Sequence, residues 1–216
     1  ISIEDAGLLA KNLGIEHSEI SIKEMYESFS LALKESFEGM GIDKTEENLQ
    51  SRCRGVTLMA LSNKLGFLVL TTGNKSEAAV GYSTLYGDTA GGFSVLKDVS
   101  KTLVYELANY RNSLSVVIPK RIIERPPSAE LAPDQKDTDS LPDYDRLDPI
   151  IEMYVEDDKS IQEIINEGFD EKEVRRIVSL IDFNEYKRRQ APLGIKISDR
   201  NFGKDRRYPI TNSWKP

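Results

Sequence analysis

The sequence has almost none of the two residue types from which metal centres and many nucleophilic sites are built. Cys53 is the only cysteine and His17 the only histidine in 216 residues. One cysteine excludes an intrachain disulfide, and no zinc-type ligand spacing exists. The pattern gives no basis for a Ser-His-Asp or Cys-His catalytic set. Cys53 lies on the apolar flank of a predicted helix, which favours a place in the core over a role as a nucleophile.

Targeting and membrane segments are also missing from the pattern. No stretch approaches the ~18 consecutive apolar residues that a membrane helix needs, and the opening ISIEDAGLLAKNLG lacks the basic start and cleavage site of a signal peptide. The formal net charge of -7 argues against general nucleic-acid binding. We therefore expect a cytoplasmic globular protein that has neither a membrane nor a nucleic acid as a partner.

Positive charge is nevertheless concentrated in one place. Between residues 187 and 207, basic side chains far outnumber acidic ones. Such a tail is either a solvated basic surface or a local site for phosphates, and the sequence alone leaves both interpretations open.

Hydrophobic periodicity predicts a chain of helices interrupted by short strands. Strands are expected at 18–22, where alternation is weak, and at 67–70, an apolar run typical of a buried parallel strand. Helices are expected at 4–13, 23–37, 46–64 and 101–110, and two more begin at Ser160 and Asp170. Irregular chain is expected at 81–97, at 126–146, and from 191 onward.

Strands that alternate with helices predict an α/β fold with a parallel sheet and flanking helices, a Rossmann-like arrangement. Two strands are fewer than the roughly five to six of a mean sheet. We therefore expect the first strands of the domain to lie upstream of Ile1. Four regions are expected: an α/β part at 1–125, an irregular loop at 126–146, a helical extension at 147–186 and a basic tail at 187–216.

The strongest local signal for a site is TTGNKSE at 71–77, directly after the predicted buried strand. A glycine turn and a helix start at the carboxyl end of a parallel strand form a crevice in which ligands of α/β sheets bind. Helix amino-terminal N–H groups attract anions there. Glu77 can hold Mg2+ against phosphates, although its spacing alone favours ordinary helix capping over this role.

Two neighbouring segments add candidate ligand contacts. Asn48, Arg52 and Gly55 share one face of the predicted helix at 46–64, and a glycine inside a helix indicates a close approach, because it costs roughly 1 kcal/mol relative to alanine. The loop GYSTLYGD at 81–88 offers aromatic faces and the carboxylate of Asp88. Lys101, at the start of the next helix, can reach a phosphate. These residues alone indicate a fragment of an α/β protein that binds a phosphate-bearing ligand.

Several stretches together resemble the NAD+ synthetases, which belong to the ATP-pyrophosphatase (adenine nucleotide alpha hydrolase-like) superfamily. The matching stretches are NLQSR at 48–52, TTGNKSE at 71–77, GYSTLYGD at 81–88, DVSKT at 98–102, IPKRIIERPPSA at 118–129, EYKRRQ at 185–190 and NFGKDRRYPI at 201–210. The resemblance covers nearly the whole chain. It points to the glutamine-dependent branch, since the shorter ammonia-dependent branch is expected to carry a lysine where Leu85 stands.

The resemblance implies a ligase that uses ATP to amidate deamido-NAD+ to NAD+ through an adenylylated intermediate. It implies Mg2+ as the metal, ammonia delivered by a glutaminase domain, and a homodimer or higher homo-oligomer. By motif, ATP contacts fall to Thr72, Lys101 and Ser128, and Lys101 is the expected catalytic residue. Contacts to deamido-NAD+ fall to Asn48, Arg52, Glu77, Asp88 and Lys187, and the metal contact to Glu77.

One departure from the family pattern is large. The pyrophosphate-binding Ser-Gly-Gly-x-Asp-Ser loop and the amino-terminal nitrilase-like glutaminase domain are both absent from the sequence. We therefore expect a truncated piece of the enzyme that is inactive by itself. Two alternatives stay open: a non-catalytic nucleotide-binding or dimerisation fragment, and another ATP pyrophosphatase such as a GMP synthetase or a tRNA-thiolating enzyme. The pairing of TGNKSE with YGD and the lack of zinc-type cysteines argue against the second alternative.

Overall fold

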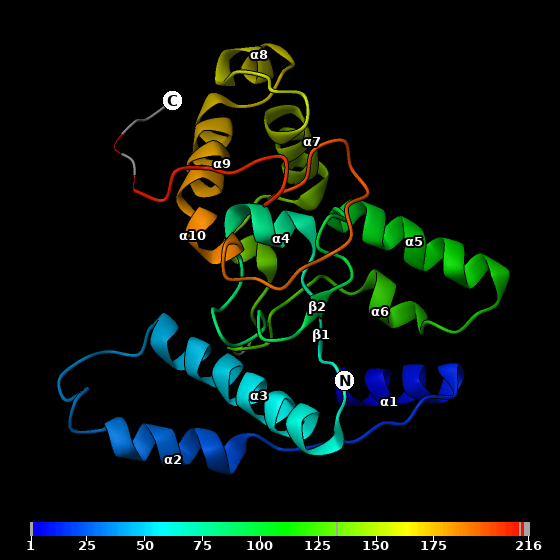
Figure 1. Cartoon of the computed structure of the whole chain (residues 1–216), viewed down its shortest axis with the longest axis vertical. Helices are drawn as coiled ribbons and strands as arrows, with labels where there is room; N and C mark the ends of the chain where they lie inside the picture. The colour runs from blue at the N-terminus through cyan, green and yellow to red at the C-terminus, as the bar shows by residue number, and fades with distance from the viewer. Residues whose placement is uncertain (1, 133, 212, 214–216) are drawn as a thin grey trace.

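The computed structural model describes residues 2–132, 134–211 and 213 (Figure 1). Ile1, Pro133 of the predicted loop, and Asn212 and residues 214–216 of the predicted tail lie outside the described residues. The helices are α1 (Ser2–Leu13), α2 (Lys23–Leu33), α3 (Lys44–Leu65), α4 (Lys75–Val80), α5 (Lys101–Leu114), α6 (Lys120–Glu124), η1 (Asp137–Asp139), α7 (Tyr144–Val155), α8 (Ile161–Asn166), α9 (Glu171–Phe183) and α10 (Glu185–Arg188). Two short strands, β1 (Leu70–Thr71) and β2 (Phe93–Ser94), lie between them.

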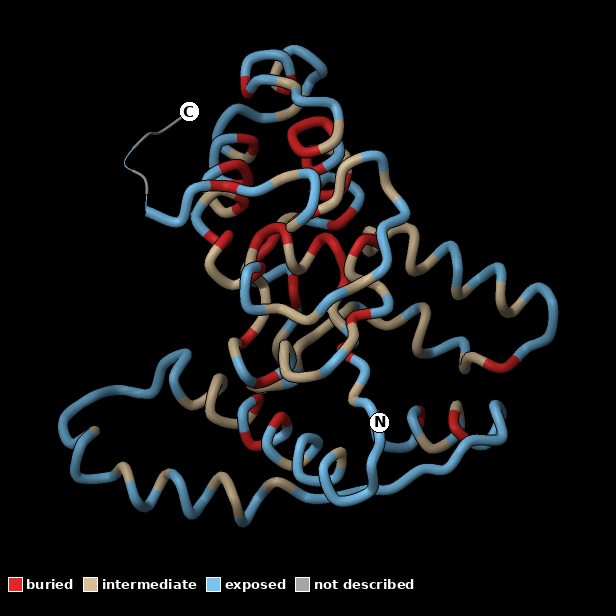
Figure 2. Tube along the Cα trace, in the orientation of Figure 1, coloured by how far each residue is buried: buried red, intermediate tan, exposed pale blue. Residues whose placement is uncertain are grey.

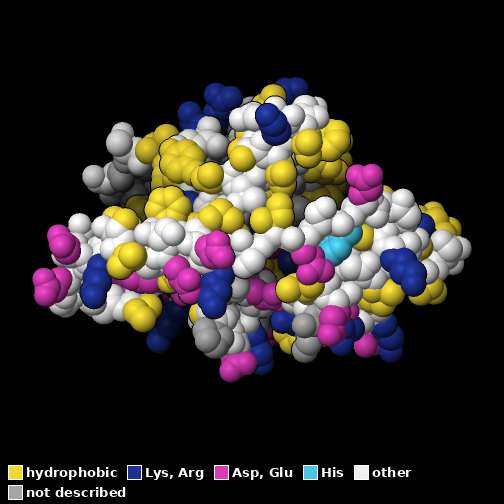
Figure 3. All heavy atoms as spheres, turned by 90° about the horizontal axis from the view of Figure 1, so that it is seen from below, with side chains coloured by type: hydrophobic (Ala, Val, Ile, Leu, Met, Phe, Trp, Pro, Cys, Tyr) yellow, Lys and Arg dark blue, Asp and Glu magenta, His cyan; other side chains and the backbone are white. Residues whose placement is uncertain are grey.

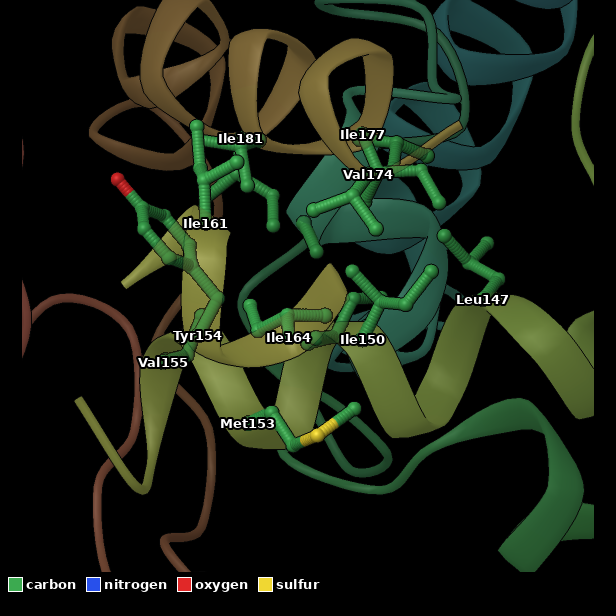
Figure 4. Packing of buried hydrophobic residues seen from close by; sticks show 14 of the residues in the cluster. Leu147, Ile150, Met153, Tyr154, Val155, Ile161, Ile164, Val174, Ile177 and Ile181 are labelled. Carbon is green, nitrogen blue, oxygen red and sulfur yellow. The ribbon is translucent and has the colours of Figure 1, made fainter. Parts of the chain in front are cut away.

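The hydrophobic core is at one end of the molecule, where α7, α8 and α9 pack against one another and around α4 (Figure 1). The apolar stripe that the sequence predicts on α9 is fully buried in this core. Ile150 of α7 and Ile164 of α8 meet this stripe from the opposite side (Figure 4). Figure 2 shows that buried residues concentrate here, while α1, α2 and α3 are mostly exposed or half-buried.

Helices begin where capping residues occur in the sequence. The Asn74 side chain accepts a hydrogen bond from the Glu77 N–H at 3.0 Å, and the Glu77 carboxylate accepts one from the Asn74 N–H at 3.3 Å. This reciprocal capping box starts α4 as predicted. Ser160 forms the same box with Glu163 before α8, and Asp170 caps α9.

The sheet has two strands, fewer than a Rossmann-like fold has. β1 and β2 pair in parallel, with Leu70 opposite Phe93 and Thr71 opposite Ser94. The prediction of an irregular loop at 81–97 is therefore wrong for β2. The predicted buried strand at 67–70 is wrong: β1 begins only at Leu70, and Phe67, Leu68 and Leu70 are 67%, 65% and 54% exposed. The Gly92 N–H bonds to the Val69 carbonyl, but the described residues leave most of the Phe67 and Leu68 side chains uncovered.

Three further sequence predictions need correction. Residues 18–22 form an irregular connection rather than a strand, because no strand in the described parts of the chain pairs with them. The predicted helix at 23–37 ends at Leu33, and α2 buries no residue that would hold a further turn against a neighbour. The predicted loop at 126–146 contains η1 and the first turn of α7.

Apolar side chains remain exposed along α2, α3 and the segment that enters β1. Examples are Leu31 at 73%, Val56 at 63% and Leu65 at 55% exposure. Seen from below, hydrophobic side chains are spread over this face of the molecule (Figure 3). Contiguous exposed apolar surface usually marks a place where another segment or molecule packs. Within residues 2–132, 134–211 and 213, no helix has the length and apolarity to cross a membrane.

Candidate functional site

A cleft of about 500 Å³ opens where β1 ends and α4 begins. Its walls come from α3, the β1–α4 turn, the 81–90 loop, the start of α5, the 128–137 segment and the chain after α10. Of the residues predicted for the site, those that line the cleft are Thr72, Glu77, Asp88, Lys101, Ser128 and Lys187. Five segments that lie far apart in the sequence thus supply the predicted side chains to one cavity.

Glu77 and Lys101 form the centre of one wall. The Lys101 Nζ lies 3.2 Å from the Glu77 Oε1, and both side chains are about four-fifths buried, with 18% and 20% exposure. Because Glu77 also caps α4, its carboxylate is fixed at the helix start while one edge faces the cleft. The capping and the functional interpretations of Glu77 are therefore compatible.

Asp148 of α7 fixes the starts of α4 and α5 together, and the sequence patterns did not single it out. Its carboxylate accepts hydrogen bonds from the hydroxyl of Ser76, and from the N–H and hydroxyl of Thr102 at 2.9 and 2.8 Å. The Ser76 hydroxyl oxygen also accepts the Lys101 N–H at 2.9 Å. This buried network positions the Lys101 backbone. The sequence feature that could have indicated a special role for Asp148 is a charged residue just before Pro149 within an otherwise apolar helix.

Asn48 and Arg52 do not line the cleft. The Asn48 Oδ1 accepts a hydrogen bond from the Thr84 hydroxyl at 2.8 Å, and the Arg52 Nε donates to the Leu85 carbonyl at 3.2 Å. Both residues therefore hold the 81–90 loop against α3. Gly55 serves the same packing, since a Cβ there would lie 2.7 Å from the Tyr86 carbonyl oxygen. The predicted close approach is real, but the approaching group is this loop rather than a ligand.

Asp88 and Lys187 carry opposite charges that interact electrostatically, and each side chain is held by hydrogen bonds to the 81–90 loop. The Asp88 Oδ1 accepts the Thr84 N–H at 2.7 Å, and the Lys187 Nζ donates to the Gly81 and Ser83 carbonyls at 2.7 and 2.8 Å. The Asp88 side chain is exposed at the surface of the cleft. The surrounding walls nevertheless remove enough water to raise the pKa of Asp88. Burial lowers the pKa of Lys187, and the Asp88 charge opposes that shift.

The segment from Ser128 to η1 closes the cleft from the α3 side. Ser128 lines the cleft, and its hydroxyl accepts the Glu130 N–H at 3.0 Å. The Gln50 side chain donates to the Leu131 carbonyl at 2.9 Å and ties the segment to α3. Asp137 also lines the cleft and was not predicted for the site. It is 3% exposed, and its Oδ2 accepts the Tyr144 hydroxyl at 2.7 Å.

The chain after α10 crosses the cleft region and is pinned by buried charges. Lys97 donates to the Pro192 carbonyl, and burial lowers the pKa of this lysine. The Lys75 Nζ lies 3.1 Å from the Asp98 Oδ1 and 2.8 Å from the Ser198 hydroxyl. Burial would raise the pKa of Asp98, but hydrogen bonds from the Ser198 and Ile197 N–H groups, the Ser198 hydroxyl and Lys75 outweigh it and lower the pKa.

The basic tail is mostly paired within the protein. Arg200 and Arg206 bind Asp158, and the Lys196 Nζ lies 2.7 Å from the Asp205 Oδ2. Among the described tail residues, the cations that line the cleft are Lys187 and Arg188. The tail therefore contributes these two charges to the cleft, while Lys196, Arg200 and Arg206 are paired with acidic side chains of the protein.

A divalent metal would find few protein ligands. Within the described parts of the chain, no group of three or more His, Cys, Asp or Glu side chains is placed to share a metal ion. Mg2+ typically takes one or two carboxylates and completes its shell with water and substrate phosphates. The Glu77 carboxylate at the cleft wall fits that mode of binding.

These features define an α/β protein with a ligand cleft at the end of a parallel strand, lined by cations and carboxylates that suit a phosphate-bearing ligand. The chain belongs to the NAD synthase family, whose sequence model matches residues 1–191. The resemblance recognised in the sequence is therefore confirmed.

Curated relatives place the chain within longer proteins. It is 57% identical over 218 residues to the glutamine-dependent NAD(+) synthetase of Acinetobacter baylyi and 55% identical over 216 residues to that of Thermotoga maritima. These matches cover 100% and 99% of the chain but 40% and 38% of the relatives. The chain thus spans about two-fifths of their length.

Solved structures agree with the family. The glutamine-dependent NAD+ synthetase of Acinetobacter baumannii, determined in complex with ADP, is 50% identical with a TM-score of 0.58 over 99% of this chain and 38% of that one. The NMN synthetase of Francisella tularensis is 31% identical with a TM-score of 0.71 over 86% of this chain and 69% of that one. The fold is therefore that of the NAD synthases, here mostly helical with a two-stranded parallel sheet.

Proposed function

We propose that this chain is the synthetase part of a glutamine-dependent NAD+ synthetase, truncated before its first strands, and that the longer cytoplasmic protein carrying it amidates deamido-NAD+ to NAD+. ATP first adenylylates the nicotinate carboxylate and releases pyrophosphate, and ammonia from a glutaminase domain then displaces AMP. The observation that carries the proposal is the convergence of Thr72, Glu77, Asp88, Lys101, Ser128 and Lys187 on one cleft.

Each side chain has a physical task in this reaction. Lys101 and Lys187 offset the negative charge of two pyrophosphate-bearing substrates, and adenylyl transfer depends on such positioning and charge neutralisation. Thr72 and Ser128 offer hydroxyls to ATP from two separate segments that line the cleft. Mg2+ held by Glu77 would neutralise phosphate charge. Asp88 accepts hydrogen bonds from deamido-NAD+, and its raised pKa follows from the same dehydrated surroundings.

Asn48 and Arg52 act on the dinucleotide in a different way from the motif-based expectation. Their hydrogen bonds to Thr84 and Leu85 hold the loop that carries Asp88. We therefore assign them as positioning residues for the deamido-NAD+ site. The exposed apolar side chains around Phe67 and Leu68 support a larger sheet in the longer protein, whose upstream strands would cover them. A homodimer or higher homo-oligomer would cover further apolar surface on α2 and α3.

The test is a steady-state assay of the longer protein with ammonium chloride, ATP, Mg2+ and deamido-NAD+, with NAD+ measured by chromatography. Nicotinate mononucleotide and XMP serve as competing substrates, because an NMN synthetase is among the similar structures and a GMP synthetase shares the ATP-pyrophosphatase chemistry. Turnover that favours either competitor would contradict the proposal. The 216-residue chain assayed alone should make no NAD+, because it lacks the pyrophosphate-binding loop, and appreciable turnover by it would refute the truncation.

A further inference from the structure

Arg54 of α3 is the cation of the cleft whose hydrogen-bond donors are least used by the rest of the protein. The cations that line the cleft are Arg54, Lys97, Lys101, Lys187 and Arg188. Lys101 lies beside the Glu77 carboxylate, and the other three lysine and arginine side chains donate to backbone carbonyls. Arg54 has one hydrogen bond among the described residues, from its Nη2 to the Glu130 carbonyl at 3.5 Å, which is longer than a normal bond. A guanidinium has five N–H donors, so the described residues leave most of those of Arg54 open to a ligand.

Attachment of the Ser128 segment to α3 does not account for this arginine. Gln50 already donates to the Leu131 carbonyl at 2.9 Å, and the Gln135 side chain donates to the Glu47 carboxylate of α3 at 3.0 Å. Both bonds are shorter than the one that Arg54 makes to the same segment. Within the described parts of the chain, no acidic side chain forms an ion pair with Arg54. A guanidinium that lines a cleft without an acidic partner favours an anionic ligand.

The surroundings of Arg54 suit an anionic group that is carried on a flat ring. Leu58 lies one helical turn further along the same face of α3, lines the cleft and is 48% exposed. Ala129 and Leu131 line the cleft from the Ser128 segment, and Gly55 adds no side chain. Apolar atoms of this kind pack well against an aromatic face and offer nothing to a chain of phosphates. A planar guanidinium beside them matches a carboxylate, to which it can donate two parallel hydrogen bonds.

Deamido-NAD+, the substrate in the proposed function, carries such a group in the carboxylate of its nicotinate ring. We propose that Arg54 binds this carboxylate and thereby distinguishes the acid substrate from the amide product. The identity of the ligand rests on the proposed function. In NAD+ the carboxylate is replaced by a neutral amide with a single acceptor oxygen, so the product keeps neither the ion pair nor the second hydrogen bond. Arg54 therefore favours binding of the acid and release of the amide.

The kinetic test compares the two dinucleotides on the longer protein. Arg54→Gln should raise the KM for deamido-NAD+ about 10-fold, equivalent to 1.4 kcal/mol. The inhibition constant of NAD+ as product should stay within about two-fold, so the preference for the acid falls about 10-fold. The KM for ATP and kcat should also stay within about two-fold, because the contact is already made in the substrate complex. Arg54→Lys keeps the charge without the planar fork and should give an intermediate KM for deamido-NAD+.

Two control variants separate this role from a structural one. Gln50→Leu removes the bond that attaches the Ser128 segment to α3, and it should change the affinities for deamido-NAD+ and NAD+ by the same factor. Lys64→Gln removes an exposed positive charge from the last turn of α3, away from the cleft, and should behave as the wild type does.

Several results would overturn the assignment. If Arg54→Gln weakened deamido-NAD+ and NAD+ equally, Arg54 would act on the phosphates that both share. A raised KM for ATP alone would assign Arg54 to ATP, and unchanged kinetics would remove it from the site. Calorimetric titration of the longer protein with each dinucleotide, without ATP, makes the same comparison without catalysis. If the acid binds through Arg54 but no NAD+ is made, the proposed function fails and the carboxylate site stands.

Discussion

Replacing Gly55 with alanine tests how the 81–90 loop is held on α3. Both Gly55 and Gly7 lie inside helices, where alanine is intrinsically more stable than glycine by roughly 1 kcal/mol. At Gly7 an added Cβ would meet nothing closer than the His17 ring at 3.8 Å. At Gly55 it would lie 2.7 Å from the Tyr86 carbonyl oxygen and 3.0 Å from that of Gly87, where ordinary contact begins at 3.4 Å.

The two substitutions should therefore change stability in opposite directions. Gly7→Ala gains the helix propensity and should raise the free energy of unfolding by about 0.5–1 kcal/mol. Gly55→Ala gains the same propensity but must push a backbone segment away, and overpacking of this kind costs about 1–3 kcal/mol. The obstructing atoms are backbone, so no side-chain rotation relieves the contact. The net change for Gly55→Ala is a loss of about 1 kcal/mol or more.

Urea unfolding followed by circular dichroism measures both variants against the wild type. A loss at Gly55 should also weaken ligand binding in the cleft, since the displaced loop carries Asp88. Calorimetric titration with deamido-NAD+ records that effect, and Gly7→Ala should bind as the wild type does. If Gly55→Ala were as stable as Gly7→Ala, the contact between α3 and the loop would not have the closeness described above.

Three further predictions concern single side chains. Asp148→Ala should lower the free energy of unfolding by about 3 kcal/mol, because Ser76 and the Thr102 N–H lose a buried acceptor. Asp145→Ala, at an exposed position, is the control and should change this free energy by less than about 0.5 kcal/mol. Equal effects of the two substitutions in urea unfolding would contradict the role given to Asp148. Asp98 has a folded pKa below its ordinary value, so its stabilisation is fully present above the unfolded pKa of about 4 and is lost as pH falls through the folded value. The gap in unfolding free energy between the wild type and Asp98→Asn should therefore shrink below about pH 4, and a constant gap from pH 7 to 3 would show the reasoning wrong. Lys187→Ala in the longer protein should raise the KM for deamido-NAD+ or lower turnover by about 10-fold, and unchanged kinetics would remove Lys187 from the site.

Local signals in the sequence predicted the helices and their starts well. Asn74 with Glu77 and Ser160 with Glu163 cap as expected, because a capping box is formed by residues three apart and needs no distant partner. The apolar stripe on α9 was predictable for the same reason. The strands were not, since a strand exists only where a distant segment pairs with it. Residues 18–22 have the composition of a strand and no partner among the described residues, while Phe93–Ser94 has a partner and little strand signal.

The site shows the same division between local and distant information. A predicted strand, a glycine and a capping residue follow one another at 71–77, and this pattern predicts a ligand site. Residues of this turn line the cleft. Asp148 and Asp137 could not be found this way, because their importance comes from Ser76, Thr102 and Tyr144, to which the fold brings them. Asn48 and Arg52 contact the 81–90 loop instead of lining the cleft, because helical spacing predicts the direction of a side chain but not what occupies the space beyond it.

The cleft has one rigid wall and one that depends on polar contacts. Glu77 and Lys101 start helices that are tied by Asp148 to α7, and α7 is part of the buried core. The 81–90 loop and the Ser128 segment are attached instead to α3, which buries only a few residues and exposes much of its apolar face. Elements with few buried contacts open more easily than a packed core. The half of the site to which we assign phosphate charge is thus preorganised within this chain, and the half to which we assign the rest of the ligand gains its stiffness only when α3 is itself supported.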